Sequence, residues 1–526
     1  MSTDYLQKIL AARVYDVAEQ TPVEHAPLLS SRLGHQIFLK REDLQPVFSF
    51  KIRGAYNKMA QLSQAQLAKG VITASAGNHA QGVALAATKI GCKAIIVMPC
   101  TTPQIKVDAV KRRGAKVVLQ GDSYDEAAAH ARLLAKNHHY TYVHPYDDID
   151  VIVGQGTIGV EILRQHTGEL DAIFIPVGGG GLCAGVATYV KYLRPEIKVI
   201  AVEPHDAACL KAALHAGKPV TLPQVGLFAD GVAVATIGKE PFRLLQTLVD
   251  DVITVSSDEI CAAIKDIFED TRVIAEPAGA VAVAGLKKYT QQLHSEKHTH
   301  NRKKLSTEHS QNLLAIVSGA NSNFDRLRYI SERTETGEGR EALLNVTIPE
   351  KPGSFRNFCQ LLGKRAITEF NYRFSDAKQA QIFVGIQLGS ETDSRQQLIH
   401  ELQKKGYPVL DLSDDEMAKL HIRHMVGGHA PACIDNEVLY RFEFPERPGA
   451  LSNFLINLGG RWNISLFHYR NHAAAYGRVL VGLEVPQNER REVRQFLKQL
   501  NFPFVEETDN PAYQLFLNAA PSAPRE

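Results

Sequence analysis

Short apolar runs alternate with amphipathic stretches over residues 35–330, and this alternation limits the folds open to the chain more than any other feature. Six runs of four to six residues are apolar enough to form buried strands: 71–74, 94–98, 116–119, 172–177, 199–202 and 313–317. Apolar residues recur at helical spacing in the segments 78–90, 104–113, 124–137 and 182–193. Buried strands separated by such helices predict an α/β fold, a parallel sheet covered by helices on both faces.

Composition and charge exclude several classes of partner. The chain has 526 residues, 44% hydrophobic and 22% charged, as in a globular protein of several domains. Because 59 Lys and Arg face 57 Asp and Glu, neither nucleic acid nor a membrane is a predicted partner. No apolar run approaches the ~20 residues of a membrane helix. No secretory signal is recognised, and seven scattered cysteines without a CxxC pair predict reduced thiols, so we expect a cytoplasmic protein.

One lysine stands where a predicted strand runs into a predicted helix. Lys51 lies in the stretch SFKIRGA, residues 49–55. The positive end of a helix dipole disfavours a charged lysine, lowers its pKa and favours the nucleophilic amine. A lone lysine is ordinarily a solvated surface residue, so other segments have to decide between these interpretations. Arg53, two positions later, is expected to form a structural ion pair rather than to act in catalysis.

A loop of small residues follows the predicted strand 71–74, where ligands gather in parallel sheets. It consists of Ser75, Ala76, Gly77, Asn78 and His79. Small residues let the backbone approach a ligand, and the N–H groups that open the next helix suit a carboxylate. Asn78 is either a ligand-binding amide or a plain helix cap. His79 is expected to be packed or solvated rather than to act as a base.

A run of glycines follows the predicted strand 172–177 and precedes a helix. The run is Gly178, Gly179, Gly180 and Gly181, followed by Leu182. Backbone N–H groups in such a loop can hold a phosphate, supported by the helix dipole. The run has neither the GK[ST] of a P-loop nor a GxGxxG with an acidic ribose partner, which argues against a dinucleotide oxidoreductase. It therefore indicates a phosphate without identifying the cofactor.

Three further segments are less specific. Ser318 brings a hydroxyl to the end of the strand at 313–317, among the small residues Gly319 and Ala320. Glu203 follows strand 199–202 and could serve either a phosphate region or a cation site, but no metal site is predicted. The polar stretch 287–310 contains four histidines at spacings that match no standard zinc site, so we expect a surface insertion loop.

The sequence pattern changes beyond residue 335, where the chain contains an internal repeat. EKPGSF at 350–355 returns as ERPGAL at 446–451, and FNYR at 370–373 returns as FHYR at 467–470. Each copy predicts the order strand, helix, strand, strand, helix, strand, which is a ferredoxin-like module. Neither copy contains a nucleophile, base or metal cluster. Two such modules behind an enzyme core suggest ligand sensing or assembly.

Together these motifs resemble the second fold type of pyridoxal-phosphate enzymes. Within that group the chain is similar to the biosynthetic threonine deaminase (threonine ammonia-lyase) family over nearly its full length, as the phrases at 40–55, 226–238, 275–280 and 323–333 indicate. The resemblance implies a two-lobed catalytic domain at 1–334, with a smaller lobe inserted at about 45–150. It also implies two ACT-like regulatory modules, at 335–430 and 431–526.

The resemblance also implies roles for individual residues. Lys51 would form a Schiff base with the cofactor aldehyde and act as the catalytic base. The backbone of residues 178–182 would hold the phosphate, Asn78 would bond to the pyridine 3′-oxygen, and Ser318 would face the pyridine nitrogen. The loop at 75–79 would take the carboxylate of the substrate.

The activity implied is deaminating dehydration of L-threonine to 2-oxobutanoate and ammonia, the first committed step of isoleucine biosynthesis. Isoleucine would be a feedback inhibitor, valine an opposing effector, and the assembly a homotetramer. Tyr372 and Tyr469 occupy equivalent positions of the repeat and are candidate effector residues. Aromatic packing is an equally good interpretation of both tyrosines.

Two alternatives stay open at the level of sequence. A degradative serine/threonine dehydratase or a serine racemase would use the same core, but single-domain forms of these enzymes lack the duplicated tail. A non-catalytic amino-acid sensor would not need Lys51, the glycine run and Ser318, all of which are intact.

Overall fold

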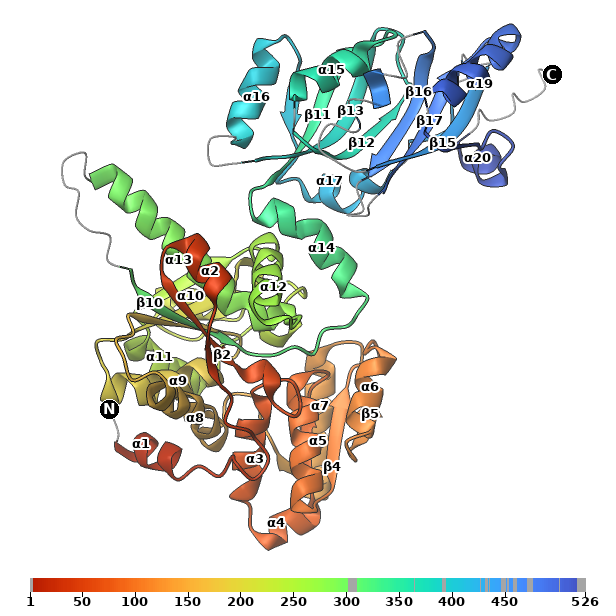
Figure 1. The fold of residues 1–526 in the computed structure, drawn as a ribbon. Helices are drawn as coiled ribbons and strands as arrows, with labels where there is room; N and C mark the ends of the chain where they lie inside the picture. Colours follow the sequence, from red (N-terminus) through yellow and green to blue (C-terminus); the bar gives the residue numbers. More distant parts are fainter. Residues whose placement is uncertain are drawn as a thin grey trace. The chain divides into compact units, whose positions relative to one another are not determined.

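The computed structural model describes residues 3–300, 310–363, 365–389, 394–425, 427–430, 434, 436–445, 451, 454–456, 461–470, 476–500 and 502–517. The chain forms two compact units, residues 1–337 and 338–526 (Figure 1). Each unit has hydrophobic cores of its own. No helix within the described residues is both long enough and apolar enough to span a membrane.

The larger sheet of the first unit has six strands in the order β1-β2-β10-β7-β8-β9. The strands are β1 (Val23–His25), β2 (Gln36–Arg41), β7 (Ala172–Pro176), β8 (Lys198–Pro204), β9 (Asp251–Val255) and β10 (Asn312–Val317). All neighbouring pairs are parallel except the edge pair of β1 with β2.

Helices cover both faces of this sheet because alternate strand residues point to opposite sides. Ile173 and Ile175 of β7 pack in one core, with helices α8 (Ile149–Gln165), α9 (Gly181–Leu193) and α11 (Lys239–Leu248). Ala172 and Phe174 pack in the other, with helices α2 (Pro27–Leu33), α12 (Ser257–Thr271) and α13 (Pro277–His300). The predicted doubly covered parallel sheet is confirmed.

A second, four-stranded parallel sheet has the order β5-β4-β3-β6. Its strands are β3 (Val71–Ala74), β4 (Ala94–Met98), β5 (Lys116–Leu119) and β6 (Thr141–Tyr142). Helices α3 (Lys51–Ala60), α5 (Asn78–Ile90) and α6 (Gln104–Lys111) share one core with it, and α7 (Tyr124–His138) shares the other. The chain thus leaves the larger sheet after β2, builds the smaller sheet, and returns at β7. The unit also contains α1 (Thr3–Leu10), α4 (Gln64–Lys69), α10 (Cys209–Ala216) and α14 (Arg326–Gly337).

The second unit is built on one antiparallel sheet of eight strands in the order β14-β11-β13-β12-β16-β17-β15-β18. The first repeat supplies β11 (Glu341–Pro349), β12 (Ile367–Arg373), β13 (Gln379–Gln387) and β14 (Val409–Asp411). The second supplies β15 (Glu437–Pro445), β16 (Asn463–Arg470), β17 (Tyr476–Glu484) and β18 (Phe504–Glu506). Described helices are α15 (Ser354–Leu362), α16 (Arg395–Lys404), α17 (Glu416–Leu420), α19 (Arg490–Gln499) and α20 (Pro511–Phe516).

The two repeats join through β12 and β16 with local two-fold symmetry. Asn371 lies opposite His468, which is its counterpart 97 positions later in the sequence. On either side, Phe370 faces Tyr469 and Tyr372 faces Phe467. The ferredoxin-like duplication is therefore one continuous sheet (Figure 1).

The surface loop expected at 287–310 is wrong for residues 287–300, which continue α13, because this stretch is polar but free of the helix breakers Gly and Pro. Residues 301–309 and the segment 446–450 of the repeat lie outside the described residues, as does Cys433. The other six cysteines are free thiols, as expected.

Candidate active site

A pocket lies at the carboxyl ends of β7 and β10, beside the first turns of α3, α5 and α9. It brings together residues that the sequence places far apart, including the predicted Lys51, Asn78, Ser318 and the glycine run. Its lining consists of Phe50, Lys51, Asn78, Tyr146, Pro176, Gly178, Gly179, Gly180, Gly181, Leu182, Gly231, Val232, Glu276, Ala278 and Ser318.

Lys51 is the first residue of α3, as its position in the sequence predicted. Its Nζ donates to the carbonyl O of Pro145 at 3.2 Å and lies 5.0 Å from the centre of the Phe50 ring. Burial lowers the pKa of Lys51 to about 8, although the nearby Glu276 carboxylate opposes this shift. A useful fraction of the amine is therefore neutral near physiological pH, as a nucleophile or a base requires.

Asn78 opens α5 but does not cap it, because the N-cap position is Gly77. Its side chain instead bridges two other residues. Nδ2 donates to Glu276 Oε1 at 2.5 Å, and Oδ1 accepts from Asn321 Nδ2 at 2.7 Å. The helix-cap interpretation of Asn78 is therefore wrong, and its amide is held at the pocket wall.

The other members of the loop at 75–79 are placed differently. His79 is buried, and its Nε2 lies 3.0 Å from the carbonyl O of Val143. Burial and the neighbouring Lys51 lower the pKa of His79 to about 3, so its ring is neutral. It is a packed histidine, as expected. Asn78 is the member of this loop that the pocket lining includes; Ser75, Ala76 and Gly77 lie just before it in the chain.

The glycine run approaches its surroundings too closely for side chains. An added Cβ on Gly178 would lie 2.8 Å from Val232 Cα, and one on Gly179 would lie 2.1 Å from the Tyr146 ring. Gly180 has a φ of +89°, a left-handed conformation that favours glycine. Helix α9 begins at Gly181, which lines the pocket, so its first turn brings unpaired backbone N–H groups to this site. Such groups suit an anion such as a phosphate.

Ser318 follows the last residue of β10 and is buried at the pocket. Its Oγ donates to the carbonyl O of Ala278 at 3.3 Å. The lone pairs of the hydroxyl stay available, so the side chain presents a neutral polar atom to the pocket rather than a charge.

Glu276 is a pocket residue that the sequence analysis did not identify as functional. Burial and the negative charge of Asp230 raise its pKa to about 7. It lies 5% exposed, just before the proline that opens α13. One feature of the sequence could have identified Glu276, because it is the single carboxylate in the apolar stretch VIAEPAGA at 273–280. A carboxylate is costly to bury without a partner.

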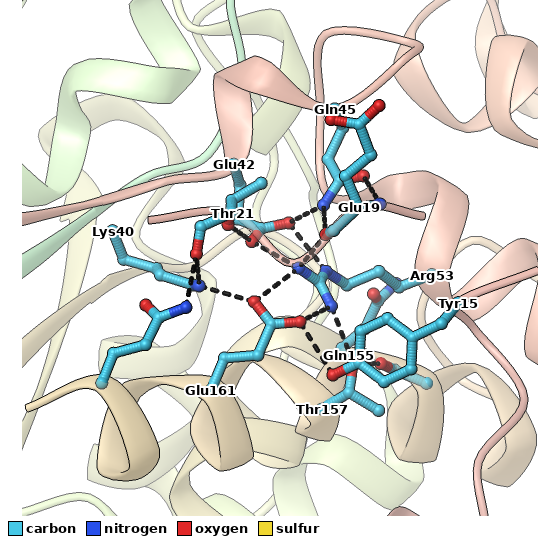
Figure 2. A network of polar contacts seen from close by, with 12 residues as sticks. Tyr15, Glu19, Thr21, Lys40, Glu42, Gln45, Arg53, Gln155, Thr157 and Glu161 are labelled. Atoms are coloured by element: carbon cyan, nitrogen blue, oxygen red, sulfur yellow. Dashed lines mark hydrogen bonds and ion pairs between the residues drawn. The ribbon is translucent and has the colours of Figure 1, made fainter. Parts of the chain in front are cut away.

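Arg53, two residues after Lys51 in α3, belongs to a buried ion network (Figure 2). It pairs with Glu42 at 2.8 Å and with Glu161 at 2.5 Å, and Lys40 pairs with Glu161 at 2.6 Å. Thr21 and Tyr15 donate hydroxyl hydrogen bonds to the two carboxylates. The predicted structural ion pair of Arg53 is confirmed.

Glu203 has a structural role in this unit. Its carboxylate accepts the backbone N–H groups of Leu210 at 2.7 Å and Lys211 at 2.9 Å, in the first turn of α10. Burial raises its pKa to about 7. Within the described residues, no group of three or more His, Cys, Asp or Glu side chains is arranged to hold a metal ion.

The two tyrosines considered as effector residues lie in the second unit, and both are buried. Tyr372 donates to Glu350 Oε2 at 2.5 Å, and its ring packs edge-on against Phe355 at 4.8 Å. Tyr469 lies in the same hydrophobic core.

Comparison with known proteins agrees with this geometry. The family model of pyridoxal-phosphate dependent enzymes matches residues 14–300. The model of the C-terminal regulatory domain of threonine dehydratase matches twice, at 332–422 and 428–517.

Full-length relatives include two biosynthetic L-threonine dehydratases named IlvA. The protein from Burkholderia multivorans is 55% identical over 98% of this chain and 100% of its own length. The protein from Escherichia coli is 56% identical over 98% of this chain and 97% of its own length. Among solved structures, the processed form of threonine deaminase isoform 2 from Solanum lycopersicum has 50% sequence identity and a TM-score of 0.59, covering 63% of this chain and 89% of that one.

The fold and the pocket thus define a pyridoxal-phosphate dependent enzyme of the second fold type. The pocket fits that cofactor because it combines a lysine amine, an anion-binding glycine backbone, an amide and a neutral hydroxyl. With full-length relatives at this identity, the chain belongs to the biosynthetic threonine dehydratase family.

Proposed function

We propose that this protein catalyses the deaminating dehydration of L-threonine to 2-oxobutanoate and ammonia, the first committed step of isoleucine biosynthesis. The observation that carries the proposal is the convergence of Lys51, Asn78 and Ser318 on one pocket that the glycine run also lines. The names of the full-length relatives support threonine as the substrate.

Four parts of the pocket would each have a role toward pyridoxal 5′-phosphate. Lys51 would bond to its aldehyde, the backbone of residues 178–182 would hold its phosphate, and Asn78 and Ser318 would bond to the ring oxygen and the ring nitrogen. When bound, the cofactor supplies an electron-withdrawing ring that makes the Cα proton of the substrate acidic.

Once the amine of threonine has replaced Lys51 on the aldehyde, the freed lysine would serve as the general base. Its amine, with a pKa of about 8, takes the Cα proton of threonine, and the resulting ammonium can return a proton to the departing β-hydroxyl. The loop at 75–79 would hold the substrate carboxylate with backbone N–H groups near the start of α5. The released enamine tautomerises to an imine, whose hydrolysis gives 2-oxobutanoate and ammonia.

Ser318 favours elimination over side reactions. A neutral hydroxyl does not hold a proton on the ring nitrogen as a carboxylate would. The ring would therefore hold less of the negative charge that develops at Cα, and loss of the β-hydroxyl removes that charge. Transamination, which needs the charge to remain on the ring, is disfavoured.

The duplicated second unit would regulate the enzyme. We assign residues 1–334 to catalysis, with a smaller lobe at about 45–150, and residues 335–430 and 431–526 to two ACT-like modules. Isoleucine would inhibit through these modules and valine would oppose it, each by preferring one of two states of a cytoplasmic homotetramer. Tyr372 and Tyr469 are the proposed effector residues, because they occupy equivalent places beside the symmetry axis of the sheet.

Steady-state formation of 2-oxo acid from threonine, measured across a titration with isoleucine, tests the proposal. We expect turnover of threonine that falls as isoleucine rises. Turnover of serine but not threonine would contradict the substrate, and a rate insensitive to isoleucine would contradict the regulation.

A further inference from the structure

The orientation of the Asn78 amide follows from a chain of contacts that starts at a backbone carbonyl. Asn321 Nδ2 donates to the carbonyl O of Val47 at 2.7 Å. A carbonyl only accepts hydrogen bonds, so the Asn321 atom facing it is the nitrogen. The second hydrogen of this nitrogen goes to Asn78 Oδ1, also at 2.7 Å. Asn78 must therefore turn its nitrogen away from Asn321.

That nitrogen meets Glu276. Asn78 Nδ2 donates to Glu276 Oε1 at 2.5 Å. The glutamate is itself fixed, because its backbone N–H donates to the carbonyl O of Gly319 at 3.1 Å. Its carboxyl lies over the same glycine, where an added Cβ would stand 2.4 Å from Oε1. One hydrogen of Asn78 Nδ2 is thus committed to Glu276, and the other is left for a ligand of the pocket that both residues line.

Several charged groups act on the Glu276 carboxyl. Besides burial, Asp230 raises its pKa, whereas Lys106 and Arg326 lower it, and Glu276 in turn raises the pKa of Lys51. The protonated and the ionised carboxyl both retain an oxygen that can accept from Asn78. The contact with Asn78 therefore does not depend on the protonation state of Glu276.

We propose that Glu276 is a positioning residue of the cofactor site. By accepting one hydrogen of Asn78 Nδ2, it directs the other hydrogen toward the ring oxygen of pyridoxal 5′-phosphate. Asn321 holds the opposite end of the amide, so the cofactor meets a donor in a single orientation. This inference rests on the proposed role of Asn78 and adds the two residues through which Asn78 acts.

The affinity of the apoprotein for pyridoxal 5′-phosphate tests the proposal through a double-mutant cycle. The cofactor is removed from the full-length enzyme with hydroxylamine, and the affinity is measured by titration of the visible absorbance. We expect Glu276→Ala to weaken binding about tenfold, as does Asn78→Ala, since each removes the same directed hydrogen bond. The double variant should be within about twofold of Asn78→Ala alone, because the two residues act as one unit.

Conservative variants separate the hydrogen bond from the charge. Glu276→Gln keeps an acceptor oxygen and should bind the cofactor within about threefold of the wild type. Glu203→Gln is the matched control, because Glu203 is also a buried carboxyl with a pKa of about 7 but lies outside the pocket lining. It should leave the cofactor affinity unchanged.

Two outcomes would overturn the inference. Losses that multiply in the double variant would mean that Glu276 acts independently of Asn78, and failure of Glu276→Gln to bind would mean that charge is what matters. If Glu276→Ala does not fold, Asn321→Ala replaces it in the cycle with the same expectation. A wild-type apoprotein that does not bind the cofactor would instead refute the proposed function itself.

Discussion

Glu161 Oε1 lies 2.5 Å from Arg53 Nη1, and both side chains are excluded from solvent. Glu161 belongs to α8 and Arg53 to α3, two residues after Lys51. The pair therefore ties the helix that presents Lys51 to a helix that packs on the larger sheet (Figure 2). Glu42 and Lys40 complete a cluster of two cations and two carboxylates.

Breaking this cluster should unfold the first unit more easily. Glu161→Ala leaves Arg53 and Lys40 buried with one carboxylate between them, so we expect the free energy of unfolding to fall by about 3–5 kcal/mol. Urea denaturation followed by far-UV circular dichroism measures the change, because the single tryptophan, Trp462, lies in the second unit. The exposed pair of Lys8 with Asp4 provides the control, since Lys8→Ala should cost no more than about 1 kcal/mol. Equal losses in the two variants would refute the structural role of the cluster.

Replacing Lys51 should abolish both the chemistry and the covalent attachment of the cofactor. We expect Lys51→Ala to lose the visible absorbance of the bound cofactor and to lower turnover of threonine by at least about 10²-fold, because general base catalysis is lost. Absorbance spectra and assays of 2-oxo acid formation measure the two effects. Wild-type absorbance or wild-type turnover in this variant would contradict the assignment of Lys51 as the residue that binds the cofactor and acts as the base.

The rate at which the apoprotein takes up the cofactor should depend on pH through Lys51. Only the neutral amine attacks the aldehyde, and the pKa of Lys51 is lowered from 10.5 to about 8. The rate should therefore rise about tenfold per pH unit below pH 8 and level off above it. Stopped-flow absorbance measures this profile. A rate that keeps rising toward pH 10.5 would show that burial does not lower the pKa of this amine.

Ser318→Asp should alter the outcome of the reaction rather than merely slow it. A carboxylate near the ring nitrogen would stabilise a proton there, so we expect slower elimination and more transamination. The ratio of 2-oxobutanoate to transamination product, measured by chromatography, reports the change. Ser318→Ala is the companion variant, because it removes the hydroxyl without adding charge. An unchanged product ratio in Ser318→Asp would mean that Ser318 does not face the ring.

A chain ending at Gly337 should be active and insensitive to isoleucine. The first unit contains the complete pocket and its own hydrophobic cores, so removing residues 338–526 leaves the proposed chemistry in place. Initial rates with and without isoleucine compare the shortened and full-length proteins. Inhibition of the shortened protein by isoleucine would place the effector site in the first unit.

Much of the first unit was predictable because its signals are local. The strands at 71–74, 94–98 and 116–119 and the helix at 78–90 agree with the structure to the residue. Strong apolar runs and an uninterrupted helical period leave few alternatives there. Strand β9 (Asp251–Val255) was missed, because its apolar run follows two aspartates and is interrupted by Thr254.

The roles of Glu276 and Asn321 were not predicted, for a different reason. Asn78 bonds to residues 198 and 243 positions away, so these contacts exist only after distant segments have packed together. Lys51, Asn78 and Ser318 were found because each lies in a loop with a recognisable motif. Glu276 lies in the segment 275–280, which contributes to the family resemblance, but its role depends on which side chain lies opposite it in space.

The pairing of β12 with β16 protects an edge strand of each repeat. Five residue pairs join the strands, from Glu369 with Arg470 to Arg373 with Leu466. A fragment holding one repeat alone would leave one of these long strands as an unprotected edge, ready to pair with another copy. Duplication in tandem supplies that neighbour from the same polypeptide. Each repeat therefore covers the edge strand through which the other could aggregate.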